Sequence, residues 1–202
     1  LARTLGIPTR LADAFAIIAA GDVQRIDVGE VNGKHFFNVA SIGLSVDIAQ
    51  RLTREQKRRW GVLAYLGHAW EALHAASSFS ARIVCDGDQL DLRSIQIAVG
   101  NGRYYGGGMT VADDATIDDR RLDLYAIERQ RWWRLMVVLP ALRWGKHKLI
   151  DGVHTLSGEV IRIETDRPMA INVDGEVIAE TPADFRVLPA VLPVFVPQPR
   201  GR

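Results

Sequence analysis

The stretch Ile171-Asn172-Val173-Asp174-Gly175-Glu176-Val177 decides the fold, because it places an Asp-Gly pair between two short apolar runs. Such a pair is the strongest short-range signal for a β-hairpin. Outward from it, the chain from Gly158 onward reads almost entirely as short strands, with further turns at Asp166–Pro168 and Thr181-Pro182. Short strands with turns every ~8–12 residues predict an antiparallel β-sandwich or barrel.

The hairpin pattern recurs earlier in the chain. Val23–Val31 alternates in polarity, Asn32-Gly33 is a turn signal, and His35–Ala40 reads as the returning strand. No β-α-β rhythm is visible, so a doubly wound parallel sheet is not expected. Further strands are predicted at Ala81–Cys85, Leu90–Val99 and Arg121–Ile127.

Helical patterns interrupt these strands at residues 47–76 and 131–144, and a short helix is predicted at Leu11–Ala20, ended by Gly21. The predicted fold class is therefore mainly β with helical insertions (α+β), built on an antiparallel β-sandwich.

Composition excludes several function classes. The chain has 202 residues, of which 48% are hydrophobic, and its 25 basic and 24 acidic residues give a formal net charge of +1. That balance argues against a general nucleic-acid binder. The single cysteine, Cys85, excludes an internal disulfide and a cysteine-built zinc site. No apolar run approaches the ~20 residues of a membrane-spanning helix.

The first residues predict a division into domains. Leu1–Pro8 reads as the back half of a helix that stops at a Gly-x-Pro signal. We therefore expect the C-terminal piece of a longer protein. Residues 1–22 would be the remnant of a truncated N-terminal domain, residues 23–188 the sandwich, and residues 189–202 a terminal strand and tail.

Carboxylates cluster in two places. The segment Asp113–Asp123 holds five aspartates, and a hard cation such as Mg²⁺ prefers such oxygen ligands. A solvated acidic loop, neutralised by Arg120 and Arg121, explains the same pattern. Asp174 and Glu176 lie at a rigid turn, where a carboxylate could take a proton from a hydroxyl or simply belong to the turn.

Two further patterns concern ligands and surfaces. The glycine-rich run from Asn101 to Gly108 either lets the backbone approach a ligand or forms a flexible loop. All five tryptophans lie in the two helical insertions, where Trp60, Trp132, Trp133 and Trp144 have Lys or Arg nearby. Tryptophan beside basic residues is typical of a helix at a lipid headgroup boundary, although ordinary amphipathic helices share the pattern.

Taken together in chain order, the motifs resemble the C-terminal two thirds of the soluble bacterial diacylglycerol kinase-like lipid kinases, relatives of sphingosine and ceramide kinases. The motifs that carry the resemblance are Leu1–Pro8, Asp27–Val31, Phe37–Gly43, Asn101–Gly108, Asp118-Asp119, Leu122–Leu124, Asp174–Glu176 and Pro189-Ala190. The resemblance implies an antiparallel β-sandwich whose active site faces an amino-terminal domain that binds ATP.

The resemblance also implies roles for residues. Mg²⁺ would be held by the Asp119 carboxylate with the carbonyls of Thr116 and Arg121. Here Arg120 stands where the family has glycine, which puts the metal site in question if that position needs a positive φ. Glu176 would be the base, with Asp174 as the nearby alternative.

The remaining expectations concern ligands and partners. Asn101, Gly102 and Gly107 are candidate substrate-binding residues. We expect a lipid substrate, a peripheral membrane surface in the cytoplasm, no nucleic acid, and a homodimer as one option. A non-catalytic lipid- or partner-binding module and a nicotinamide-nucleotide kinase relative stay open as alternatives, and the isolated chain is expected to be inactive.

Overall fold

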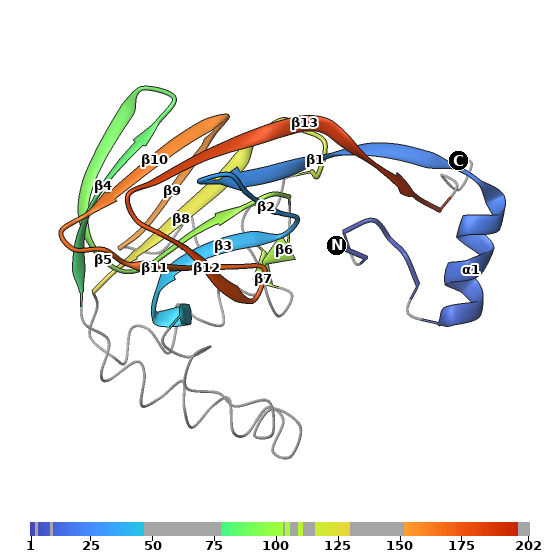
Figure 1. Cartoon of the computed structure of the whole chain (residues 1–202), viewed down its shortest axis with the longest axis horizontal. Coiled ribbons are helices and arrows are strands. Elements are labelled where there is room, and N and C mark those ends of the chain that lie inside the picture. Colours follow the sequence, from blue (N-terminus) through green and yellow to red (C-terminus); the bar gives the residue numbers. More distant parts are fainter. Residues whose placement is uncertain are drawn as a thin grey trace, which may run out of the picture.

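The computed structural model describes residues 1–2, 4–8, 10–46, 78–102, 104–105, 109–110, 116–129 and 152–197. In this part the chain is mostly antiparallel β-sheet, as the sequence predicts (Figure 1). An eleven-stranded sheet folds over on itself, and every strand pair described in it is antiparallel. A separate two-stranded hairpin joins β6 (Tyr104–Tyr105) to β7 (Met109–Thr110).

The sheet forms two layers that share one long strand, β5 (Asp88–Gly100). One layer continues from β5 through β3, β11 and β12 on one side, and through β8 and β9 on the other. Its strands are β3 (Val39–Gly43), β8 (Leu122–Glu128), β9 (Val153–Gly158), β11 (Ala170–Val173) and β12 (Glu176–Glu180).

The second layer continues from the first half of β5 through β4, β10, β13 and β1 to β2. Its strands are β1 (Val23–Val31), β2 (Lys34–Phe36), β4 (Phe79–Cys85), β10 (Val160–Thr165) and β13 (Ala183–Phe195). The change of layer within β5 coincides with a register shift between Ser94 and Gln96. The buried Ser94 hydroxyl lies 2.8 Å from the carbonyl oxygens of Gln96 and Ile127, so it satisfies polar backbone where the ladder is irregular.

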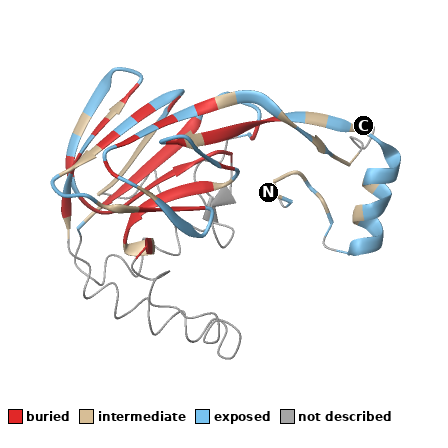
Figure 2. Cartoon of the chain, viewed as in Figure 1, coloured by how far each residue is buried: buried red, intermediate tan, exposed pale blue. Residues whose placement is uncertain are grey.

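The core lies between the two layers, and the buried residues that form it come from strands of both (Figure 2). In some strands buried and exposed residues alternate, as expected for a strand with one face toward the core. Strand β4 shows the pattern clearly: Phe79, Ala81, Ile83 and Cys85 are buried, and the residues between them are mostly exposed. The rings of Phe36 and Phe185 meet edge to face with centroids 6.4 Å apart. Aliphatic residues fill most of the remainder, including Ile42, Ile97, Leu124, Ile161, Ile163 and Ile171.

Strands β1 and β13 extend beyond the sandwich as a two-stranded ribbon that leads to helix α1 (Leu11–Ala20) (Figure 1). Within β1, Ile26 pairs with Leu192 but Val28 pairs with Leu188, so β13 bulges opposite Asp27. Bulges bend and twist a strand, and this one lies where the ribbon leaves the sandwich. We call this position the ribbon joint.

Some of the elements lie where the sequence predicts them. Strand β1 and helix α1 have the predicted bounds, and α1 ends at Gly21, which has a φ of 79°. Residues 1–8 contain one helical-type turn, with the Leu5 N–H donating to the Leu1 carbonyl, and Gly6 has a φ of 68°. The predicted helical insertions 47–76 and 131–144 lie outside the described residues.

One predicted strand is wrong. The single strand expected at His35–Ala40 is divided into β2 and β3, with a break at Phe37 and Asn38. The break has a physical cause, because the backbone N–H groups of these residues bond to a side-chain carboxylate instead of a neighbouring strand.

Candidate functional site

The Asp174-Gly175 turn is held from both sides by hydrogen bonds. Both residues have positive φ values, 49° and 105°, as a tight hairpin turn requires. The Asp174 carboxylate accepts N–H bonds from Phe37 at 2.6 Å, Asn38 at 3.1 Å and Val39 at 3.0 Å. Asp174 is therefore committed to the loop between β2 and β3.

Glu176 follows this turn as the first residue of β12, and its side chain is exposed. Within the described part of the chain, its carboxylate forms neither a hydrogen bond nor an ion pair. The backbone beside it is fixed, because the Gly175 N–H donates to the Asn172 Oδ1 at 2.8 Å. Of the two candidate bases, Glu176 thus has the free carboxylate on a rigid support.

The predicted metal ligands lie together in the loop before β8. The two oxygens of the Asp119 carboxylate accept the Thr116 N–H at 2.9 Å and the Arg121 N–H at 3.0 Å. The carboxylate therefore lies beside the two residues whose carbonyls were expected to complete the site. Asp119 is exposed, and each of its oxygens retains a further lone pair. One carboxylate and two carbonyls would be a ligand set suited to a hard cation.

Arg120 does adopt the conformation for which a glycine would be suited, with a φ of 60°. The Arg120 N–H donates to the Asp27 Oδ2 at 2.7 Å, which holds the residue in this conformation. Arg120 in place of the family's glycine is therefore compatible with the loop conformation in which Thr116 and Arg121 bond to Asp119.

Asp27, at the ribbon joint, belongs to the Asp27–Val31 motif, but the sequence assigned it no role in the site. Its side chain is only 2% exposed, and its second oxygen, Oδ1, accepts the Ala190 N–H at 2.7 Å. The Asp27 backbone N–H donates to the Ile117 carbonyl at 2.9 Å. The signal available in the sequence was a charged residue between Ile26 and Val28 in a strand, because a buried charge needs dedicated partners.

Asn101 connects the two carboxylate regions. It is 3% exposed, its backbone N–H donates to the Asn38 carbonyl, and its side-chain amide donates to the Asp27 carbonyl, both at 2.9 Å. Since Asn38 also bonds to Asp174, a continuous series of hydrogen bonds joins the Asp174 turn to the Asp119 loop.

The other candidate substrate-binding residues are glycines. Gly102 has a φ of 93° and is buried, and a Cβ added there would lie 3.4 Å from the Ile117 Cβ. It therefore packs against the Asp119 loop. Gly107 lies outside the described residues.

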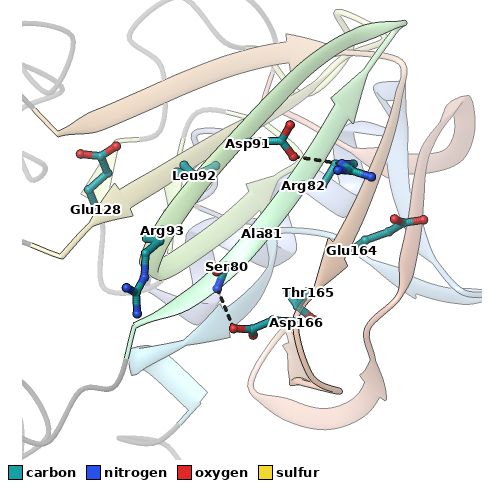
Figure 3. Close-up of a pocket in the computed structure, with 10 residues that line it drawn as sticks. All are labelled: Ser80, Ala81, Arg82, Asp91, Leu92, Arg93, Glu128, Glu164, Thr165 and Asp166. Carbon is teal, nitrogen blue, oxygen red and sulfur yellow. Dashed lines mark hydrogen bonds and ion pairs between the residues drawn. The ribbon is translucent and has the colours of Figure 1, made fainter.

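A surface pocket of about 660 Å³ lies elsewhere, across β4, β5, β8 and β10 (Figure 3). Its charged side chains already have partners. Arg82 bonds to Asp91 at 3.0 Å, Glu128 lies 3.0 Å from His154, and Asp166 accepts the Ser80 N–H at 3.2 Å. The pocket contains none of the predicted site residues.

Two properties of the described residues bear on the site. They contain no group of three or more His, Cys, Asp or Glu side chains placed to hold a metal ion, so a cation at Asp119 would depend on backbone oxygens. No helix among them is both long and apolar enough to cross a membrane.

The chain is similar to proteins of a known family. A family model described as the YegS C-terminal NAD kinase beta sandwich-like domain matches residues 38–196. The chain belongs to this family. The YegS C-terminal domain matched here includes the Asp174 turn, the Asp119 loop and Asn101, and it excludes α1 and β1.

Individual relatives of this YegS C-terminal domain carry lipid kinase names. A Staphylococcus haemolyticus protein named "Putative lipid kinase SH2167" is 26% identical over 96% of this chain and 63% of its own length. A Staphylococcus saprophyticus protein named "Diacylglycerol kinase" is 26% identical over 96% of this chain and 64% of its own length. The chain thus spans less than two thirds of the length of these relatives.

Solved structures agree with this likeness. The Bacillus anthracis structure titled "Crystal structure of a putative diacylglycerol kinase" superposes with a TM-score of 0.75 at 25% identity. The superposition covers 98% of this chain and 64% of that one. The resemblance to the C-terminal part of the diacylglycerol kinase-like lipid kinases and the mainly β fold are both confirmed.

Proposed function

We propose that this domain forms the acceptor side of an ATP-dependent lipid kinase, which phosphorylates a lipid hydroxyl such as that of diacylglycerol. The observation that carries the proposal is the free carboxylate of Glu176 on a turn immobilised by Asp174 and Asn172. The names of the relatives support the same reaction class.

In this mechanism Glu176 accepts the proton of the lipid hydroxyl, since phosphoryl transfer requires an oriented nucleophile and little other covalent chemistry from the protein. Asp174 orients the turn through its three backbone contacts. Asp119, with the carbonyls of Thr116 and Arg121, would hold Mg²⁺. That ion supplies positive charge near the site when it is bound.

The proposal assigns the ATP phosphates to a nucleotide-binding half that is not part of this chain. The isolated chain should therefore bind ATP poorly and show negligible turnover. A clear lipid kinase rate from the isolated chain would contradict this part of the proposal.

The decisive assay uses a protein extended upstream of Leu1 to include that half. Transfer from radiolabelled ATP would be measured with diacylglycerol, phosphatidylglycerol, ceramide, sphingosine and NAD as acceptors, for wild type, Glu176→Gln and Asp174→Asn. Transfer to a lipid that is lost in Glu176→Gln supports the proposal. Transfer that survives Glu176→Gln moves the base elsewhere, and transfer to NAD alone favours the nicotinamide-nucleotide kinase alternative.

Two surface properties belong to the same proposal. Peripheral membrane association is tested by sedimentation with anionic liposomes, and binding without any transfer would favour the non-catalytic lipid-binding module. A homodimer is also proposed, because β12 is an edge strand with Val177 and Ile178 exposed. Light scattering measures its mass.

A further inference from the structure

The Asp119 loop and the ribbon joint are joined by several direct hydrogen bonds. Asp27 holds Arg120 in the loop and Ala190 in the β13 bulge with its two carboxylate oxygens, both at 2.7 Å. Its own N–H bonds to Ile117, also in the loop. Arg120 and Ala190 both have positive φ values, 60° and 50°, so one buried carboxylate fixes two conformations that side chains rarely adopt.

Two exposed hydrogen bonds are made by the residues of β1 that precede Asp27. The Gln24 side-chain amide, on the ribbon, donates to the Asp118 carboxylate in the loop at 2.9 Å. The Arg25 guanidinium donates to the Ala190 carbonyl at 2.7 Å. The loop is therefore bonded to β1 at Gln24 and Asp27. Arg25 and Asp27 in turn bond β1 to Ala190 in the β13 bulge.

We infer that the Asp119 loop and the ribbon joint move as one unit, so that a divalent cation bound at the loop stiffens the ribbon and fixes the direction in which it leaves the sandwich. The ribbon continues into α1, so its direction also sets the position of α1 relative to the sandwich (Figure 1). The bonded unit rests on the contacts above, and only its response to a cation rests on the proposed function.

The test measures backbone amide hydrogen exchange by mass spectrometry, in peptides covering the loop and the two ribbon strands. Asp119→Ala removes the acceptor of the Thr116 and Arg121 amides, so it should loosen the loop without any metal. Loss of hydrogen bonds of this kind should accelerate exchange roughly three- to tenfold, in the ribbon strands as well as in the loop. Unchanged exchange in the ribbon strands would overturn the inference.

Asp86→Ala is the matched control. The Asp86 carboxylate also accepts backbone N–H bonds, from Glu159 and Val160 at 2.9–3.1 Å, but it lies in the turn between β4 and β5. The Asp86→Ala variant should accelerate amide exchange near residues 159–160 and leave exchange in the ribbon unchanged. Equal acceleration of the ribbon by both variants would show general destabilisation and would also overturn the inference.

Gln24→Ala provides a mild second variant, since Gln24 is partly exposed and its loss should leave the sandwich folded. It should accelerate exchange in the loop as well as in the ribbon. An effect confined to the ribbon would argue against the coupling.

A final arm adds Mg²⁺ to wild type and to Asp27→Asn. In wild type the cation should slow exchange in both loop and ribbon, and in Asp27→Asn it should slow exchange in the loop alone. Protection of the wild-type loop without the ribbon would overturn the coupling. If Mg²⁺ protects neither, the cation site fails while the Asp119→Ala comparison still decides whether loop and ribbon form one unit.

Discussion

Replacing Asp174 should destabilise the fold far more than replacing Glu176, although the two carboxylates are only two residues apart. Asp174→Ala removes the acceptor of three backbone N–H groups. A hydrogen bond to a charged group contributes about 1.5–3 kcal/mol when buried and less when exposed, and the three contacts share one carboxylate. Counting them together at about 2–3 kcal/mol, and adding about 1 kcal/mol for an alanine at a φ of 49°, gives a loss of about 3–4 kcal/mol.

Asp174→Asn should lose about half as much, because asparagine keeps one carbonyl oxygen and tolerates positive φ. Urea unfolding followed by circular dichroism measures the free energy of unfolding of both variants, and thermal unfolding followed in the same way measures their Tm. For a chain of this size, 1 kcal/mol corresponds to about 2–4 °C in Tm, so Asp174→Ala should unfold about 10 °C below wild type.

Glu176→Ala is the control, since its side chain is exposed and has no partner within the described residues. It should change the free energy of unfolding by less than about 0.5 kcal/mol. If the Asp174 and Glu176 variants prove equally stable, the assignment of Asp174 to a structural role is refuted.

Three further outcomes are expected. Gly43→Ala should lower the free energy of unfolding by more than about 3 kcal/mol, because the φ of Gly43 is 95° and the new Cβ would lie 2.4 Å from the Ile95 carbonyl oxygen. Gly33→Ala, which has open space around it, should lower it by about 1 kcal/mol in the same urea titration. Burial, reinforced by nearby Asp86 and Asp88, raises the pKa of the Cys85 thiol, so iodoacetamide should label this thiol only as fast as the chain unfolds. The free energy of unfolding should also fall as pH rises through the range where a thiol ordinarily ionises, because the thiol then ionises in the unfolded chain before it does in the folded one. Rapid labelling of the native chain, or no such decline relative to Cys85→Ala, would contradict this. Arg120→Gly should raise stability by up to about 1 kcal/mol, because glycine adopts a φ of 60° without strain, and a fall in Tm would show that the Arg120 side chain contributes contacts of its own.

Local patterns predicted much of the fold. Alternating polarity and the Asn-Gly and Asp-Gly turns were enough to place β1 and the β11–β12 hairpin, because hairpin pairing is decided by neighbouring residues. The strand expected at His35–Ala40 was wrong for the opposite reason. The carboxylate that divides it belongs to Asp174, more than a hundred residues later in the chain.

In the candidate site, too, contacts between residues distant in the chain could not be predicted from the sequence. The sequence pointed to Asp119, Asp174 and Glu176 as chemically useful residues, but it could not distinguish a carboxylate committed to backbone N–H groups from a free one. The role of Asp27 was missed because it arises from partners in a distant loop and in β13, Arg120 and Ala190.

The pairing of β1 with β13 has a consequence for how the chain is made. Strand β13, the last one in the described part of the chain, lies between β10 and β1, so each of these strands keeps one unpaired edge until Ala183–Phe195 has been synthesised. Closing such distant contacts is slow, and the open edges offer sites for aggregation in the meantime. Slow maturation of the newly made chain, and a benefit from chaperones that shield strand edges, would follow from this order of assembly alone.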